Sequence, residues 1–273
     1  SKKGGGKVIL TAKTYTISED IDMPSGVGLI GQGRDLTILE FSGGARGLSW
    51  IGTSATQHKN FEIKDFTLQN SNNAAGIDID YADFWRMENV RVTSCDQDGI
   101  NVDHSKNWMI INCRSDNNTS EGINIYGDNT RSTSNFSMIA TECDTNTSFG
   151  LQTLLIGDNG VIYGAYINCI AHNNGGSGIV SSGGVVSADN VRSSYIGCFS
   201  YDNTGNGINV TTQHTRLIGC DASGNSSDDF IIQDSLNIII GCDTSSPDDT
   251  VVGGATDVNV NNKIKHQRKI NLL

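Results

Sequence analysis

The sequence predicts an all-β fold, a single-stranded right-handed parallel β-helix of about 11 or 12 coils for a coil of about 23 residues. Three observations predict it: a repeat with fixed internal spacing, short apolar runs with a period of two, and the lack of amphipathic helical stripes in the 273 residues. Leucine-rich and helical repeats would need helical return segments, which the sequence does not contain. The architecture is therefore a solenoid built from strands.

The repeat consists of an Ile, a Cys two residues later, an Asn five residues after the Cys and a Gly nine residues after it. A fourth copy keeps the first three of these positions. The copies are Ile111/Cys113/Asn118/Gly122, Ile167/Cys169/Asn174/Gly178, Ile196/Cys198/Asn203/Gly207 and Ile218/Cys220/Asn225. A coil of a solenoid buries its apolar face only against its neighbours. We therefore expect Ile111, Ile167 and Ile196 to share one interior column.

The strands follow from apolar pairs that come after a Gly and are separated by one polar residue. These pairs are Ile77/Ile79, Ile100/Val102, Ile123/Ile125 and Ile208/Val210. Alternation with a period of two indicates a strand with one buried and one exposed face. The apolar members of each pair are expected to point inward.

Two interior ladders are expected from the stacking. Seven Cys residues recur at comparable points, and we predict that they are free structural thiols, because the count is odd and stacked coils hold Cβ atoms too far apart for a disulfide. The Asn residues at 118, 174, 203 and 225 are interpreted as a turn ladder, since Asn tolerates the left-handed conformation.

Composition and charge limit the partners. Residues 1–260 are predicted to form one β-helix and residues 261–273 a basic C-terminal tail, either solvated or the start of a following segment. The net charge of −11 argues against nucleic acid, and no apolar run is long enough for membrane insertion. The first strand has no cap in the sequence, so we expect that a cap was trimmed or is supplied by another chain or domain.

The candidate site comes from aligning Gly76, Gly99 and Gly122 as equivalent points of successive coils. This alignment puts Asp80, Asp103 and Tyr126 in one outward row. A second outward row, two residues earlier in each coil, consists of Asp78, Asn101 and Asn124. Asp80 and Asp103 then lie about one coil spacing apart, and their mutual repulsion should raise one of the two pKa values.

Such a pair of carboxyl groups suits glycoside hydrolysis, in which one donates a proton and the other acts as nucleophile or base. The candidate catalytic residues are Asp80, Asp103, His104 and Tyr126. The candidate substrate-binding residues are Asp78, Asn101, Asn124, Lys106, Arg131, Trp85 and Trp108. A lyase would instead use His104 or Tyr126 as base, with Arg86, Lys106, Arg131 or Ca²⁺ neutralising a uronate. The alternative interpretations are solvent-facing carboxylates, a turn role for His104 and packing roles for the Trp residues.

Several segments resemble the pectate-lyase-like superfamily of right-handed parallel β-helices. They are the opening coils, with Gly4–Leu10, Tyr15–Ile17, Pro24–Val27, Leu29–Gly33 and Thr37–Leu39, and the later runs Ser115–Asn118 and Ala171–Asn174. Within the superfamily the layout is similar to mannuronan C5-epimerase catalytic modules and to phage tailspike and appendage depolymerases. The superfamily contains lyases, hydrolases, epimerases and non-catalytic binders.

What this resemblance implies is an extracellular, secreted or virion-surface protein that recognises a polysaccharide or cell-surface glycan. It leaves three functions open: a depolymerase, a non-catalytic viral appendage or adhesin, and a uronan C5-epimerase-like module. The epimerase signature, a Tyr-Gly-Phe-Asp-Pro-His-like run, is matched only loosely by Asp98–His104, where Asn101 stands at the Asp position and Asp103 at the His position. A homotrimer or a larger multidomain chain is compatible with the resemblance. A Ca²⁺ ion is possible, and the sequence assigns no ligands to it.

Overall fold

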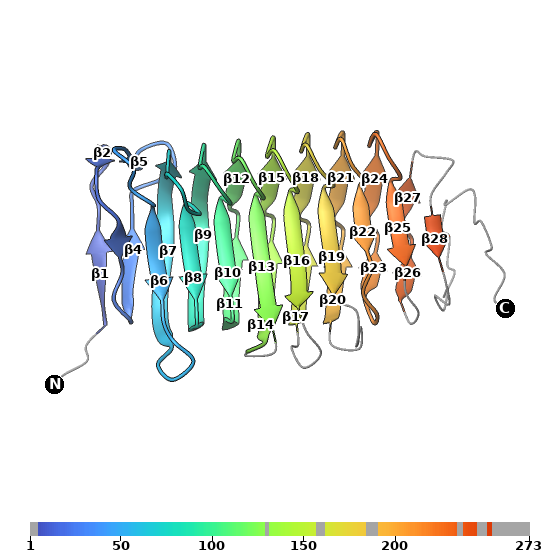
Figure 1. Ribbon diagram of the computed structural model, residues 1–273, viewed down its shortest axis with the longest axis horizontal. Helices are drawn as coiled ribbons and strands as arrows, with labels where there is room; N and C mark the ends of the chain where they lie inside the picture. The colour runs from blue at the N-terminus through green and yellow to red at the C-terminus, as the bar shows by residue number, and fades with distance from the viewer. Residues whose placement is uncertain are drawn as a thin grey trace.

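The computed structural model describes residues 5–128, 131–156, 162–183, 191–233, 237–244 and 250–252. Within these residues every regular element is a β-strand, and the strands pair in parallel to form one right-handed β-helix (Figure 1). No helix long and apolar enough to cross a membrane occurs in this part of the chain. Residues 261–273, the predicted basic tail, lie outside the described residues.

A ten-stranded sheet forms one wall and contributes one strand per coil, so that ten coils are stacked. Its strands are β3 (Ile21–Asp22), β6 (Leu48–Ile51), β8 (Ile77–Asp80), β10 (Ile100–Asp103), β13 (Ile123–Asp128), β16 (Leu151–Ile156), β19 (Ile179–Gly183), β22 (Ile208–Val210), β25 (Phe230–Gln233) and β28 (Thr250–Val252). The spacing of about 23 residues holds from Ile77 through Ile100 to Ile123, but the next two paired positions are Leu151 and Ile179. These coils are longer than the repeat of about 23 residues, so the ten coils counted within the described residues take up more chain than that repeat predicts.

The rest of each coil belongs to an 18-stranded sheet. Its strands are β1 (Gly6–Ile9), β2 (Thr14–Ile17), β4 (Val27–Ile30), β5 (Ile38–Phe41), β7 (His58–Gln69), β9 (Ala82–Thr93), β11 (Lys106–Ile111), β12 (Arg114–Asp116), β14 (Thr133–Ile139), β15 (Glu142–Asp144), β17 (Ile162–Ile167), β18 (Ile170–His172), β20 (Val191–Ile196), β21 (Phe199–Tyr201), β23 (Arg216–Ile218), β24 (Asp221–Ser223), β26 (Ile238–Ile240) and β27 (Asp243–Thr244).

This second sheet bends along a column of residues in the left-handed conformation. The column includes Asn89 (φ 53°), Asn112 (φ 49°), Asn168 (φ 51°) and Gly197 (φ 59°). Asn and Gly adopt this conformation at the lowest cost, which is why they recur at the bend. A left-handed residue interrupts the alternation of the strand, so the side chains before and after it no longer follow the period of two.

The bend overturns one prediction. Ile111, Ile167 and Ile196 do share a column, through the pairs Ile111–Ile139, Ile139–Ile167 and Ile167–Ile196, but the column faces outward. Ile196 is 38% exposed, whereas its neighbour Tyr195 is fully buried. The Cys two residues after each Ile points inward because the left-handed residue between them resets the alternation. The stacking was predicted correctly, and the direction of the Ile column was not.

The interior is lined by ladders of like residues. All seven Cys are buried and free, although Cys95 and Cys143 lie outside the column that Cys113, Cys169 and Cys198 share. The Asn ladder is confirmed and gains one member that the sequence repeat did not show. In it each side-chain amide donates to the amide oxygen of the next coil at 2.9–3.0 Å, in the order Asn118, Asn146, Asn174, Asn203 and Asn225.

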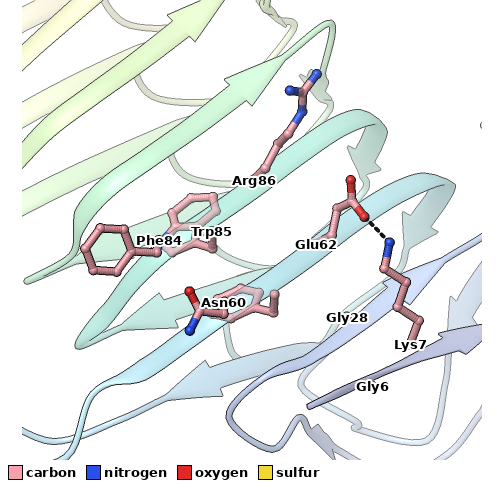
Figure 2. A pocket seen from close by; sticks show the side chains of 9 residues that line it. Gly6, Lys7, Gly28, Asn60, Glu62, Phe84, Trp85 and Arg86 are labelled. Atoms are coloured by element: carbon pink, nitrogen blue, oxygen red, sulfur yellow. Dashed lines mark hydrogen bonds and ion pairs between the residues drawn. The ribbon is translucent and has the colours of Figure 1, made fainter. Parts of the chain in front are cut away.

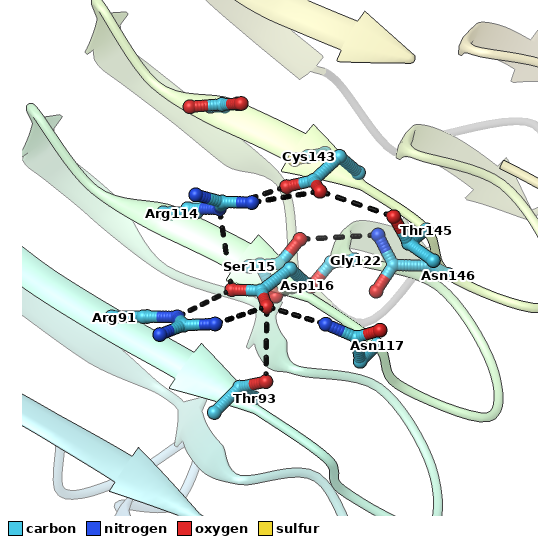
Figure 3. A network of polar contacts seen from close by, with 12 residues as sticks. Arg91, Thr93, Arg114, Ser115, Asp116, Asn117, Gly122, Cys143, Thr145 and Asn146 are labelled. Carbon is cyan, nitrogen blue, oxygen red and sulfur yellow. Dashed lines mark hydrogen bonds and ion pairs between the residues drawn. The ribbon is translucent and has the colours of Figure 1, made fainter. Parts of the chain in front are cut away.

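Beside the Asn ladder, charged side chains link three coils on the outside of the bend (Figure 3). Arg91 donates two hydrogen bonds, of 2.8 and 2.7 Å, to the carboxylate of Asp116, and Arg114 donates two of 2.9 Å to Asp144. Burial tends to raise the pKa of Asp116, but the bonds from Arg91 and the other donors outweigh it and lower the pKa. These ionic contacts stabilise the stack where the sheet changes direction.

Candidate functional site

The candidate site lies on the outer wall of the ten-stranded sheet, where β8, β10 and β13 run side by side. Their register aligns Asp80 with Asp103 and Asp103 with Tyr126. The second row is aligned in the same way and consists of Asp78, Asn101 and Asn124. The Ile and Val residues between these side chains are fully buried, so both rows face outward as the alternation predicted.

Hydrogen bonds hold the second row in place. The side-chain amide of Asn101 donates to Oδ1 of Asp78 and to Oδ2 of Asp103, both at 3.1 Å. Asn124 donates to Oδ1 of Asn101, also at 3.1 Å. Burial and the charge of Asp80 raise the pKa of Asp78, against the bond from Asn101. The row is therefore a pre-oriented polar strip.

Asp103 is the carboxyl group in the site with the most strongly raised pKa. Burial, followed by the charges of Asp80 and Asp78, raises its pKa to about 6, although the bond from Asn101 and the charge of His104 act in the opposite direction. Its Oδ1 is buried and accepts no hydrogen bond within the described part of the chain. A carboxyl group with these properties can hold a proton near neutral pH and donate it.

His104 lies between two carboxylates. It has a left-handed backbone (φ 46°), which turns its side chain toward the rows. Its Nδ1 lies 2.9 Å from Oδ1 of Asp80. Its Nε2 lies 3.1 Å from Oδ1 of Asp128, an ion-pair contact that does not have the geometry of a hydrogen bond. The ring stacks on Tyr81 with centroids 4.6 Å apart and contacts Tyr126 edge-on at 5.6 Å.

These contacts determine the charge of His104. Burial lowers its pKa, but the hydrogen bond to Asp80 and the charges of Asp80, Asp128 and Asp103 together outweigh burial, so the pKa is raised. The imidazole is thus stabilised as a cation, which orients Asp80 and is a poor base. Sequence reasoning missed Asp128 and Tyr81. Their only signal was proximity along the chain, because Asp128 lies on β13 with Tyr126 and Tyr81 directly follows Asp80 at the end of β8.

The cations expected near the site are partly engaged. Nη2 of Arg131 lies 2.6 Å from Oδ1 of Asp83, an aspartate of β9 that the sequence did not single out. The backbone N–H of Lys106 donates to the same oxygen at 3.1 Å. The guanidinium of Arg131 also lies 5.9 Å from the Tyr81 ring. Arg131 therefore stabilises Asp83 and Tyr81, and a substrate carboxylate would have to compete for it.

The two Trp residues are not where a sugar could reach their faces. Trp85 and Trp108 are each 3% exposed and stack on each other inside the coil, with centroids 5.0 Å apart. The stack continues to Phe61 and Phe136, at 6.0 and 4.2 Å. Their assignment as substrate contacts is corrected by this burial. The two side chains are buried because these positions of β9 and β11 face the interior of the coil.

The polar strip continues toward the N-terminal coils. Asp22 pairs in register with Ser49, and Ser49 with Asp78. A hollow beside this row is lined by Asp20, Asp22, Arg46, Ser49 and Asp78, among other residues. The hollow therefore lies over β3, β6 and β8, and Asp78 at its edge is the neighbour of Asn101 in the second row.

Two other features of the surface have some of the properties of a site. A second hollow on the other wall contains the Lys7–Glu62 ion pair at 2.7 Å and the exposed ring of Phe84 (Figure 2). Ligand atoms of Glu142, Asp144 and His172 lie within 4.8 Å of one another, as a cation site would require. However, His172 bonds Glu142 at 2.9 Å and Asp144 bonds Arg114. The Ca²⁺ expectation therefore stays a prediction.

Comparison with known proteins supports the fold. No protein-family model matches the sequence, and no curated protein sequence does. The ORF18 protein of Geobacillus virus E2 is similar over 89% of this chain, with a TM-score of 0.72 and 17% identity, and the chain spans 50% of its length. Pectate lyase Pel9A is similar over 92% of this chain and 71% of its own, with a TM-score of 0.67 and 12% identity.

A third similar structure is the A-module of the mannuronan C-5 epimerase AlgE4 from Azotobacter vinelandii. It covers 94% of this chain and 91% of its own, with a TM-score of 0.59 and 18% identity. At such identities the similarity establishes the fold and not the activity. The chain has the pectate-lyase-like right-handed parallel β-helix fold that the sequence predicted.

Proposed function

We propose that this chain is an extracellular, secreted or virion-surface β-helix that binds a polysaccharide and hydrolyses its glycosidic bonds on the outer wall of the ten-stranded sheet. The observation that carries the proposal is the in-register pair of Asp80 and Asp103, in which Asp103 has a pKa of about 6 and a free carboxylate oxygen. Glycoside hydrolysis requires two carboxyl groups, one of which holds a proton to donate.

In this mechanism Asp103 donates its proton to the leaving glycosidic oxygen. Asp80, oriented by its contact with Nδ1 of His104, attacks the anomeric carbon or takes a proton from water. Neighbouring coils are about 4.8 Å apart, which is closer to the roughly 5 Å carboxyl separation of retaining enzymes than to that of inverting ones. His104 is a positioning residue, because it acts through Asp80.

A lyase is less well supported. Burial, followed by the charges of Asp128 and Asp103, raises the pKa of Tyr126, which disfavours the phenolate that would abstract a proton. His104 is stabilised as a cation, and Arg131 is paired with Asp83. A lyase needs a free base near the uronate, and neither Tyr126 nor His104 offers one.

Two alternatives have an observation in their favour. A non-catalytic viral appendage or adhesin that binds host glycan is supported by the similarity to the Geobacillus virus E2 protein and by the internal pairing of Asp80 with His104. A uronan C5-epimerase-like module is supported by the similarity to the AlgE4 A-module. The loose match at Asn101 and Asp103 to the epimerase signature weighs against it.

The test is incubation with capsular, alginate and pectic polysaccharides, following reducing ends, the absorbance of unsaturated uronates and the C5 configuration. We expect new reducing ends without unsaturation. Asp80→Asn and Asp103→Asn should each abolish most of the activity, while the exposed control Asp96→Asn should not. Full activity in either site variant would remove the proposed site, and binding without cleavage would support the adhesin.

A further inference from the structure

A ladder of isoleucines runs along the outside of the 18-stranded sheet. The isoleucine ladder contains one residue from each of six successive strands, and each residue pairs in register with the next. Its members are Ile111, Ile139, Ile167, Ile196, Ile218 and Ile240. All six are at least partly exposed, and Ile196 reaches 38%. Ile170 and the 43% exposed Phe199 lie just beyond the bend and widen the strip. A continuous apolar strip of this kind marks a contact surface.

The two flanks of the isoleucine ladder carry opposite charge. On the side that precedes the ladder in each coil, Arg192 and Arg216 are exposed and line a hollow with Ser194, His214 and Ile238. On the side beyond the bend, Glu142, Asp221 and Asp243 stand in one register row with Ile170 and Phe199. Toward the N-terminal coils the same row holds Arg114 and Arg91, which are bound to Asp144 and Asp116, so the acidic flank is confined to the later coils.

At the C-terminal end of the acidic flank two carboxyl groups lie next to each other. Asp221 and Asp243 are neighbours in register, and burial followed by the charges of Asp243 and Asp229 raises the pKa of Asp221. A guanidinium brought to this flank would relieve that repulsion. Arg216 and Asp221 belong to the same coil, on either side of Ile218, so a rotation about the coil axis can bring one to the other.

We propose that the isoleucine ladder is the contact surface between copies of this chain, packed side by side around an axis parallel to the coil stack. Another copy has the same rise of about 4.8 Å per coil, so its isoleucines match at every rung. Rotation about such an axis places the arginine flank of one copy against the acidic flank of the next. An antiparallel pair would instead bring the arginine flanks together, which like-charge repulsion disfavours.

The expected homotrimer is one assembly with this geometry, and any cyclic oligomer with a parallel axis satisfies the charge argument. The inference does not depend on the proposed hydrolysis, because none of its residues lies on the ten-stranded sheet. It assigns different tasks to the two walls of the coil.

The test is the mass of the full chain in solution by light scattering and sedimentation equilibrium. We expect an oligomer, and we expect Ile167→Glu/Ile196→Glu to weaken association about 100-fold or more, because each copy buries both side chains. Leu36→Glu, at a 57% exposed leucine away from the ladder, is the matched control and should not change the mass. If the double variant does not fold by circular dichroism, Phe199→Ser at an exposed position provides the same measurement.

Charge exchange tests the orientation. Arg216→Glu and Asp221→Arg should each weaken association about tenfold, and the two together should restore it. A monomeric wild-type chain, a double ladder variant that stays assembled, or a failure of the exchanged pair to recover would each overturn the proposal.

Discussion

The two outer walls of the coil use the same backbone for different surfaces. On β8, β10 and β13, outward positions hold Asp, Asn and Tyr, which bond one another and a central His104. On β11 to β26, one outward position per coil is Ile in six successive coils. Stacking brings like residues together on both walls, so a row of carboxylates develops shifted pKa values and a row of isoleucines develops an apolar strip.

The comparison teaches that function on a solenoid is decided by columns and not by single residues. A lone outward Asp would be a solvated side chain, but burial in the row, followed by the charges of Asp80 and Asp78, raises the pKa of Asp103. A lone outward Ile is unremarkable on a protein surface, but six in register form a strip that water solvates poorly.

The largest expected effect comes from variants that separate activity, assigned to one wall, from assembly, assigned to the other. Asp103→Asn should lower kcat/KM about 1,000-fold, since a general acid contributes about 10²–10⁴, and should leave the oligomer mass unchanged. Ile167→Glu/Ile196→Glu should do the reverse and keep the activity per chain within about twofold. Cleavage assays and light scattering on the same preparations check this. Loss of activity in the ladder variant would show that the two walls are not independent.

The second prediction compares the inner and outer sides of β9 and β11. Trp108→Ala should lower the free energy of unfolding by about 4 kcal/mol, because it empties a space between Trp85 and Phe136. Phe84→Ala, at a ring that is 55% exposed, should cost less than about 1 kcal/mol. Urea unfolding followed by circular dichroism measures both. Equal costs would contradict the assignment of Trp108 to the core.

The smallest expected effect is the pH dependence of stability that the polar wall of the ten-stranded sheet produces. Because its folded pKa is raised, the stability that His104 contributes is fully present below its ordinary pKa of 6.5 and is lost as the pH rises through the folded value. His104→Gln should therefore be less stable than wild type at pH 5.5, and the deficit should shrink at higher pH.

Asp103 acts in the same direction. Its pKa rises from 3.8 to about 6 on folding, so ionising it costs stability as the pH rises from about 4 through 6. Asp103→Asn should gain melting temperature relative to wild type across that interval. Thermal unfolding from pH 4 to pH 8 measures both variants, and curves parallel to wild type would contradict the proposed charge states.

The sequence was sufficient to predict the stack and the register of the candidate site. Gly76, Gly99 and Gly122 mark equivalent points, and alternation with a period of two then places Asp80 beside Asp103 without further information. The free thiols and the Asn ladder follow from the same repeat. These features are local, and each depends on a regular strand.

The direction of the Ile column could not be obtained in this way. It depends on one left-handed residue, and only the recurrence of Asn112, Asn168 and Gly197 one residue after the Ile hinted at it. Asp83 and Arg131 meet across two coils through the positions of turns, which no spacing rule specifies. The sequence therefore predicts which residues stack on one another better than it predicts how side chains point at the bends and turns.

The buried thiols have a consequence for how the protein matures. Burial raises the pKa of Cys113 to about 12, so its thiolate, the form that reacts with oxidants and disulfides, is scarce. A fold whose cysteines serve only to pack the interior needs no oxidant or disulfide isomerase to reach its final form. Such a chain can be completed in a reducing cell interior and then work in an oxidising medium without changing its covalent structure.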